Sequence, residues 1–214
     1  MTAPTTLSRR TALKIGAGAL LASFSAWRFG GLIANSLADD DRILLLYATK
    51  YGATRDTAQW IADGLQRPVE LVDIRDSANP GGYGEKTRFI LGSAVLTEGP
   101  MRTMCDYIRE HASVLNGRVV ATFVVCGTSL DSEKGQARIA SYLSQLNAPL
   151  RPAPTLSRAF GGRLMVAKLT DEDRDALTRF YAIARQQPLA DWDRTDPRAA
   201  AQFADRLRGS VFND

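Results

Sequence analysis

The fold is decided by residues 43–65, which read ILLLYATKYGATRDTAQWIADGL. The stretch opens with a continuous apolar run, which is typical of a strand buried on both faces of a sheet. It ends with apolar residues at helical spacing, among them Ala58, Ile61 and Leu65. A short loop containing Gly52 joins the two parts. A buried strand that leads through a short loop into a helix predicts an α/β fold with a parallel sheet.

The remainder of the chain repeats this alternation of short apolar runs and longer helical segments. No internal repeat or low-complexity tract interrupts it, so residues 39–214 are expected to form one domain with helices on both faces of the sheet. The connection after the second strand is rich in turn residues and predicts a loop or a short irregular helix. The expected strands are 43–47, 69–73, 89–91, 119–126 and 156–160, and the expected helices are 54–65, 101–111, 133–146, 171–185 and 197–207.

The loop after the first strand is the candidate ligand site, because ligands of open parallel sheets bind at the carboxyl ends of the strands. Thr49, Gly52 and Thr54 bring hydroxyl groups and backbone N–H groups to the start of a helix, where the helix dipole favours an anion. The pattern therefore predicts a phosphate site. The loop lacks the ending of a Walker loop and the three glycines of a dinucleotide-binding turn. The alternative interpretation is structural, with Thr54 as a helix N-cap and Gly52 as a turn residue.

Residues 45–61 resemble the flavodoxin fingerprint over their whole length. The resemblance implies a flavodoxin-like, doubly wound sheet of five parallel strands in the order 2-1-3-4-5. It also implies non-covalently bound FMN as the cofactor. The expected ligands of the FMN phosphate are Thr49, Lys50, Tyr51, Gly52, Ala53 and Thr54.

Two further segments are similar to the loops that enclose the flavin ring in that family, residues 90–95 (ILGSAV) and 123–128 (FVVCGT). The resemblance implies ring contacts from Gly92, Ser93, Ala94, Val95, Gly127, Thr128 and Ser129. The Trp and Tyr that sandwich the ring in short flavodoxins are replaced by Leu96, Thr97, Ser129 and Leu130. A more open flavin face would suit a bulky partner such as a quinone. Alternatively, an aromatic side chain comes from elsewhere, for instance Tyr51 or Tyr83.

Within the superfamily, the chain most resembles the menaquinone-dependent protoporphyrinogen oxidase branch. The similar features are the short second connection, residues 159–164 (AFGGRL), Asp191-Trp192 and Phe203-Ala204. Three functions stay open: an FMN oxidoreductase of the cell envelope that uses a quinone or a redox protein, a protoporphyrinogen oxidase, and a flavin-free binding module. The export signal described next favours the first of these over the second, because that oxidase acts in the cytoplasm.

The N-terminal segment resembles a twin-arginine export signal. Residues 8–14 (SRRTALK) precede an uncharged, mostly apolar run, although Ala12 replaces the usual Phe. Cleavage after Ala38 would leave Asp39 at the mature N-terminus. The alternatives are an uncleaved membrane anchor and an amphipathic cytoplasmic helix. We therefore expect residues 1–38 to be a signal or anchor that engages the twin-arginine machinery, and the protein to be periplasmic or anchored facing the periplasm.

Charge and residue counts exclude several other functions. Four of the 27 basic residues lie within residues 1–38, which contain no acid, so the rest of the chain has 23 basic and 23 acidic residues. This balance gives no reason to expect nucleic-acid binding. The only histidine, His111, is expected at the end of a helix beside Glu110, so neither a His-based triad nor a site with several histidine ligands is expected. One histidine and two cysteines are too few ligands for a zinc or iron–sulfur site. Cys105 and Cys126 are either a disulfide pair or two separately packed thiols.

Several single residues of reactive or aromatic types are expected to have structural rather than catalytic roles. His111 is expected at the end of a helix. Asp171, Glu172 and Asp173 open a helix, where acidic side chains favour the dipole. Phe180, Tyr181 and Trp192 are expected to be core or docking aromatics rather than cofactor contacts. The chemistry is therefore expected from the flavin.

Overall fold

The computed structural model describes residues 42–76, 82–97 and 99–212, so the predicted signal segment and its cleavage site lie outside the described residues. Five strands form a parallel sheet in the order β2-β1-β3-β5-β6, which confirms the predicted order. A short strand, β4 (Gly99–Pro100), pairs antiparallel with the end of β3. The parallel strands are β1 (Ile43–Ala48), β2 (Val69–Asp73), β3 (Arg88–Leu96), β5 (Val119–Cys126) and β6 (Leu156–Gly161).

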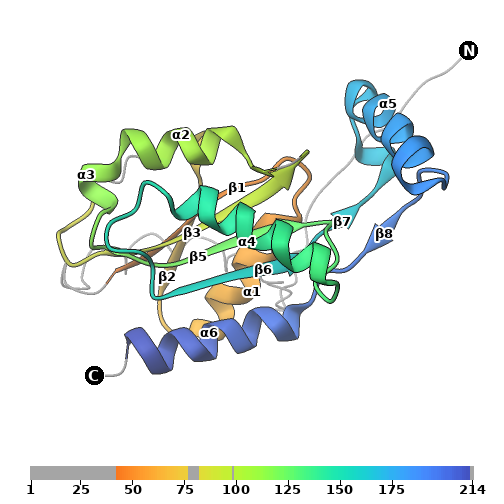
Figure 1. The fold of residues 1–214 in the computed structure, drawn as a ribbon. Helices are drawn as coiled ribbons and strands as arrows, with labels where there is room; N and C mark the ends of the chain where they lie inside the picture. The colour runs from red at the N-terminus through yellow and green to blue at the C-terminus, as the bar shows by residue number, and fades with distance from the viewer. Residues whose placement is uncertain (1–41, 77–81, 98, 213–214) are drawn as a thin grey trace, which may run out of the picture. The chain divides into compact units, whose positions relative to one another are not determined.

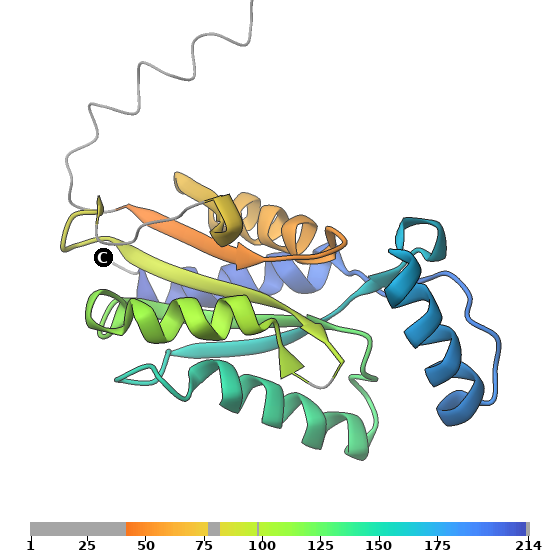
Figure 2. The same ribbon diagram turned by 90° about the horizontal axis from the view of Figure 1, so that it is seen from above.

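Helices cover both faces of this sheet (Figures 1 and 2). Helices α1 (Ala53–Leu65) and α6 (Pro197–Val211) pack on one face, and α2 (Arg102–Glu110), α3 (Ala112–Leu115) and α4 (Glu133–Asn147) pack on the other. Every residue of β1 is buried. Its alternate side chains enter two different cores, which is why its sequence is a continuous apolar run rather than an alternating one.

Strand β3 is longer than its sequence suggests, and the predicted end at Leu91 is wrong. The strand continues to Leu96, and Gly92 pairs with Tyr47 on one side and Phe123 on the other. A Cβ on Gly92 would fall 2.2 Å from the ring of Phe123, so the missing side chain is what lets that ring pack against the strand. The glycine that resembles a loop residue in the sequence is therefore required by the packing of the sheet.

Residues 162–196, here called the insert, leave the sheet between β6 and α6 (Figure 1). The insert contains β7 (Arg163–Leu164), η3 (Val166–Lys168), α5 (Asp171–Phe180), the π-helical turn η4 (Tyr181–Arg185) and β8 (Trp192–Asp193). Its two short strands pair antiparallel. The predicted helix 171–185 is thus two helical segments that extend from the carboxyl ends of the strands rather than a helix that covers the sheet (Figure 2).

One carboxylate fastens the insert to the loop after β1. Asp173 lies 2.6 Å from the Lys50 ammonium and accepts a hydrogen bond from the Tyr51 hydroxyl. The hydrogen bond from Lys50, followed by that from Tyr51, lowers the pKa of Asp173, and the same contact raises the pKa of Lys50. A second ion pair joins Arg163 to Asp56 in the first turn of α1, at 2.6 Å. The insert is therefore held against the start of α1 by charge.

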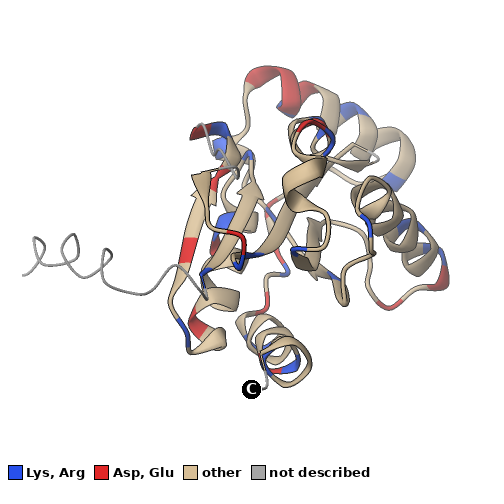
Figure 3. Cartoon of the chain, turned by 90° about the vertical axis from the view of Figure 1, so that its left-hand side faces the viewer, with Lys and Arg blue, Asp and Glu red and all other residues tan. Residues whose placement is uncertain are grey.

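Two smaller features complete the fold. The 3-10 turn η1 (Ile74–Asp76) follows β2, and part of the predicted loop beyond it, residues 77–81, lies outside the described residues. Figure 3 shows basic and acidic residues on many of the same helices, strands and loops, in keeping with the balanced charge count. No helix in the described ranges has the length and hydropathy needed to cross a bilayer.

Two helical glycines allow a matched test of the contact between α1 and α6. A Cβ on Gly64 would lie 2.8 Å from the Ala204 Cβ and 3.3 Å from the Ala201 Cα, whereas a Cβ on Gly209 would meet nothing within 4 Å. Gly209→Ala should stabilise the fold by up to about 1 kcal/mol through helix propensity. In Gly64→Ala the added methyl group would overpack the contact with α6, which offsets the gain in helix propensity. We expect this variant to be less stable than Gly209→Ala by on the order of 1–3 kcal/mol in urea unfolding. Equal stabilisation by both would show that the two helices are not closely packed.

A second prediction concerns the contact of Asp173 with Lys50 and Tyr51, here called the tether. Asp173→Asn keeps the shape of the side chain and removes its charge, so amide hydrogen exchange should become faster at Lys50, Tyr51 and the first turn of α5. Asp171→Asn is the matched control, because Asp171 lies in the same turn but is exposed and pairs within its helix with Arg174. Exchange in this control should remain as in the unmodified chain. The same exchange rates in both variants would contradict the tether.

The tether should also depend on pH with a defined sign. The pKa of Asp173 is below its ordinary value of 3.8, so the stabilisation is complete above that value and is lost as the pH falls through the lower folded pKa. The pKa of Lys50 is above 10.5, so the stabilisation is complete below that value and is lost as the pH rises further. Protection of the first turn of α5 should therefore be constant at neutral pH and fall at both extremes, and Asp173→Asn should remove this dependence.

Candidate functional site

The loop after β1 ends in a left-handed turn that starts α1. Gly52 has φ +91° and occupies the N-cap position, which suits glycine because a Cβ is unfavourable there. Its N–H donates to the Thr49 hydroxyl at 3.0 Å, and its carbonyl accepts the first helical hydrogen bond from Asp56 at 3.0 Å. No side chain caps the helix. The N–H groups of the first turn of α1 therefore have neither an intrahelical acceptor nor a side-chain cap.

Thr54 contributes an unsatisfied hydroxyl to the same place. Its side chain is 1% exposed, and its Oγ1 has no hydrogen-bond partner. The interpretation of Thr54 as an N-cap is wrong, because Gly52 holds that position and Thr54 lies inside the first turn. A buried hydroxyl without a partner is costly, and an acceptor placed at the helix start would satisfy it. The residues present fit the phosphate group of FMN.

Charged side chains around the loop are largely paired with one another. Lys50 pairs with Asp173, and Asp56 is contacted by both Arg163 and Arg55. The hydrogen bond with Asp56 raises the pKa of Arg163. Since these pairs compensate much of the basic charge, a phosphate at this site would be held mainly by neutral donors and the helix dipole.

The exit of β3 reaches the same edge of the sheet, but at later residues than the sequence suggests. Gly92 and Ser93 are buried within the strand, and the Ser93 hydroxyl accepts a hydrogen bond from the N–H of Met101, the residue after β4, at 2.9 Å. Ala94 and Val95 are half-buried, Leu96 is 37% exposed, and Thr97 has a left-handed φ of 60°. Ala94 to Thr97 therefore lie nearer the edge of the sheet than Gly92 and Ser93.

The exit of β5 is covered by the insert. A Cβ on Gly127 would fall 2.9 Å from the Trp192 indole, and the Gly127 carbonyl accepts a hydrogen bond from Arg194 at 3.2 Å. The following residues, Thr128 and Ser129, line a cavity that is described below. Gly127, Thr128 and Ser129 thus lie at the carboxyl edge, at the end of β5, as the expected role of this loop requires.

The structure also locates the aromatic and cysteine candidates. Tyr51 is at the phosphate loop, but Tyr83 donates its hydroxyl to Glu70 and lies by the amino end of β5, at the edge of the sheet opposite the flavin loops. Trp192 donates to the Tyr181 hydroxyl at 2.8 Å, which agrees with a docking role for these two side chains. Cys105 and Cys126 are free thiols, and burial raises the pKa of both.

His111 is the C-cap residue of α2, as predicted, and its ring packs against Tyr107 with centroids 4.5 Å apart. Within residues 42–76, 82–97 and 99–212, no three His, Cys, Asp or Glu side chains are grouped as metal ligands would be.

Sequence reasoning missed the residues that the insert brings to this edge. The sequence pattern predicts only a helix-dipole role for Asp173 and no contact for Arg163 or Arg194. Their contacts depend on the path of the insert, which no local pattern encodes. Lys134 and Arg138 also line the cavity. Their i, i+4 spacing at the start of α4 is a sequence signal that could have identified them as one face of a helix.

The comparisons with known proteins agree with this fold. Residues 44–189, more than half of the chain, match the flavodoxin domain family. A search of curated proteins finds no significant match.

Solved structures are similar at low identity. Oxidised flavodoxin 1 from Bacillus cereus is 16% identical, with a TM-score of 0.47 over 79% of this chain and 99% of that one. A flavodiiron core from Synechocystis is 16% identical, with a TM-score of 0.45 over 81% of this chain and 37% of that one. A flavoprotein in complex with FMN from Lactobacillus acidophilus is 15% identical, with a TM-score of 0.39 over 55% of this chain and 92% of that one. These values are too low to carry a functional argument, and the assignment rests on the family match. With that match and this strand order, the chain belongs to the flavodoxin domain family, and FMN is the cofactor that the family supports.

Proposed function

We propose that the protein is an FMN-dependent oxidoreductase of the cell envelope that exchanges electrons with a quinone or a redox protein. The observation that carries the flavin part is the unpartnered, buried Thr54 hydroxyl under the uncapped start of α1. Both features are unfavourable without a ligand, and both are satisfied by a bound phosphate. FMN, when bound, supplies reversible two-electron redox chemistry.

The residues of this chain would position the cofactor rather than take part in the chemistry. Thr54 and the first N–H groups of α1 hold the phosphate, and Gly52 lets the backbone turn closely around it. The exits of β3 and β5 present Leu96 and Ser129, both exposed, where short flavodoxins place aromatic rings. A flavin face without these rings is open to a bulky partner, which supports an electron exchange with a quinone.

The location in the envelope rests on the N-terminal sequence. Arg9 and Arg10 precede an apolar run, as in twin-arginine signals, and this pathway carries folded proteins, which suits a cofactor loaded before export.

A second candidate function is oxidation of protoporphyrinogen. The feature that favours it is the segment of resemblance to that branch, residues 159–164 and Asp191-Trp192, which forms the end of β6 and part of the insert beside the exit of β5. Formation of fluorescent protoporphyrin with a quinone as acceptor would distinguish this function from general quinone reduction.

The cofactor site is tested by a matched pair of isosteric substitutions. Thr54→Val should weaken FMN binding roughly 10- to 100-fold, because a hydrogen bond to a charged group is lost. Thr87→Val is the control, since the Thr87 hydroxyl is also buried and unpartnered but lies beside Arg118, at the amino end of the sheet. Neither variant should be less stable without FMN. Fluorescence titration with FMN measures the affinities. Equal FMN affinities of Thr54→Val and Thr87→Val would show that the Thr54 hydroxyl does not bind the phosphate.

Electron exchange is tested with the FMN-loaded protein under anaerobic conditions. A reduced menaquinone analogue should bleach the visible flavin absorbance, and an oxidised quinone should restore it. Free FMN at the same concentration is the control for uncatalysed reduction. If the bound flavin reacts no faster than free FMN with quinols and with reduced redox proteins, the proposed oxidoreductase function is wrong.

Export is tested by fusing residues 1–45 to a reporter that is active only after translocation in folded form. Arg9→Lys with Arg10→Lys should abolish the signal, because the paired arginines are the recognised feature. Lys14→Arg, which keeps the charge and lies outside the pair, should leave it unchanged. Reporter activity that does not depend on Arg9 and Arg10 would contradict twin-arginine export.

A further inference from the structure

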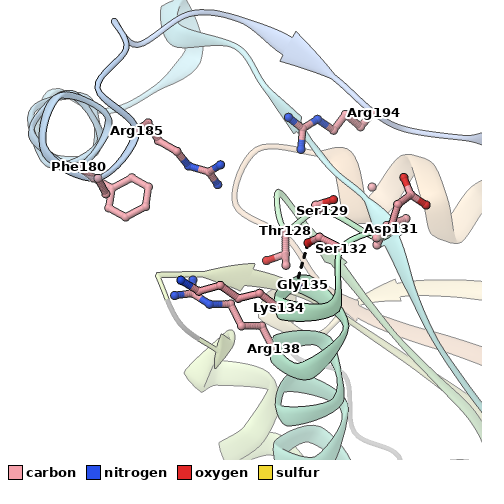
Figure 4. A pocket seen from close by; sticks show the side chains of 13 residues that line it. Thr128, Ser129, Asp131, Ser132, Lys134, Gly135, Arg138, Phe180, Arg185 and Arg194 are labelled. Atoms are coloured by element: carbon pink, nitrogen blue, oxygen red, sulfur yellow. Dashed lines mark hydrogen bonds between the residues drawn. The ribbon is translucent and has the colours of Figure 1, made fainter.

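A cavity of about 710 Å³ lies between the start of α4 and the insert. Thr128, Ser129 and Gly135 line it on the side of the sheet, and Phe180 and Arg185 line it on the side of the insert (Figure 4). None of the residues expected to bind the FMN phosphate is among its lining residues. The cavity is therefore distinct from the phosphate site, although it shares the Thr128–Ser129 segment with the loop expected at the flavin ring.

Basic side chains from three elements meet at this cavity. Lys134 and Arg138 extend from α4, Arg185 from η4, and Arg194 from the segment after β8 (Figure 4). The one acidic side chain in the lining, Asp131, lies on the other side of the cavity from Lys134 and Arg138 in this view. The lining thus has four basic groups and one acidic group in a domain whose total charge is balanced.

These cations are not used by the fold. Lys134, Arg138 and Arg185 form no ion pair or hydrogen bond through their side chains with any residue that the structure describes. Arg194 stacks over Trp192 and donates to the Gly127 carbonyl, neither of which neutralises its charge. By contrast, Arg163, Arg174 and Arg208 elsewhere in the chain each contact an aspartate. Like charges collected around one cavity repel one another unless a ligand neutralises them.

The cavity also supplies hydrogen-bond donors and an apolar surface. The Thr128 and Ser129 hydroxyls line it, and the start of α4 adds the positive end of a 15-residue helix. The N-cap Ser132 is already used, because it accepts from the Gly135 N–H at 3.1 Å. Phe180, which is 47% exposed, offers a ring face beside Arg185. Guanidinium groups pair well with carboxylates and phosphates, and the ring suits an organic body.

We propose that this cavity is a binding site for a small organic polyanion, a molecule with at least two carboxylate or phosphate groups. The acidic groups face Lys134, Arg138 and Arg185, and the organic body lies against Phe180. A ligand bound here contacts the Thr128–Ser129 segment. The inference does not rest on flavin binding, because the cations and the cavity are present irrespective of the cofactor.

The test uses citrate and ATP as probes in isothermal titration of the full-length chain, with acetate as the monovalent comparison at constant ionic strength. Citrate, ATP or both should bind at least about tenfold more tightly than acetate. Binding of citrate alone identifies a polycarboxylate site, and binding of ATP alone identifies a polyphosphate site. If neither binds more tightly than acetate, the proposal is overturned.

Charge-matched variants locate the binding. Lys134→Ala with Arg138→Ala should weaken the affinity at least about tenfold. Arg198→Ala with Arg206→Ala removes the same charge from α6, on the opposite face of the sheet, and should change the affinity less than about twofold. Circular dichroism should show that both double variants are folded. An equal loss of probe affinity in both double variants would mean that binding depends only on the net charge of the protein, and the assignment of the site to this cavity would be wrong.

FMN provides a control that separates this site from the proposed function. Citrate or ATP binding should persist in Thr54→Val, whose flavin affinity is expected to be reduced. Loss of probe binding in Thr54→Val would place the probe in the phosphate loop and overturn the cavity as the site. Failure of FMN to bind would contradict the proposed function and leave the prediction for the probes unchanged.

Discussion

The site depends on the way the chain passes from β1 into α1. Gly52 in the left-handed region turns the chain within one residue and starts the helix without a side-chain cap. The strand that delivers it is wholly buried and is hydrogen-bonded to β2 on one side and β3 on the other. Since the strand order changes direction between β1 and β3, the loops after these strands flank a crevice. The uncapped helix start therefore lies at the edge of the sheet where a ligand can reach it.

The insert links this loop to the loop after β5. Its α5 end contacts the phosphate loop through Asp173, and its β8 end packs against Gly127 through Trp192. The segment after β8 also packs closely against β6 at Gly161. A Cβ on Gly161 would lie 2.0 Å from the Arg194 carbonyl oxygen, so this approach needs a glycine. One segment therefore contacts two of the loops that are expected to surround the flavin. Movement of the insert would therefore change both loops together.

The sequence predicted most of the sheet, because its signals are local. Strands β2 and β5 have the predicted bounds. Strand β5 is buried at every residue, as its apolar run indicates, whereas β2 is an edge strand without a fully buried residue. The end of β3 was missed because Gly92, Ser93 and Ala94 have little preference for strands. There the packing of Phe123 and the pairing with β1 and β5 decide the conformation. The start of α1 was predicted within one residue, but the hydroxyl of Thr54 was assigned by its residue type, and only the structure shows that it lacks a partner.

The path of the insert could not be predicted for a different reason. Its helix and its acidic first turn follow from the sequence, but the partners of those charges lie more than a hundred residues earlier in the chain. The same holds for the cavity, because Arg185 of the insert and Lys134 of α4 line it from segments that are far apart in the sequence. A balanced charge count gives no reason to expect a broad basic surface for nucleic acid. The count says nothing about local imbalance. Aspartates pair with Lys50 and Arg163 beside the phosphate loop, whereas Lys134, Arg138 and Arg185 at the cavity have no ion pair with any residue that the structure describes. Net charge thus limits long-range attraction, whereas the pairing of individual side chains determines where a small anion can bind.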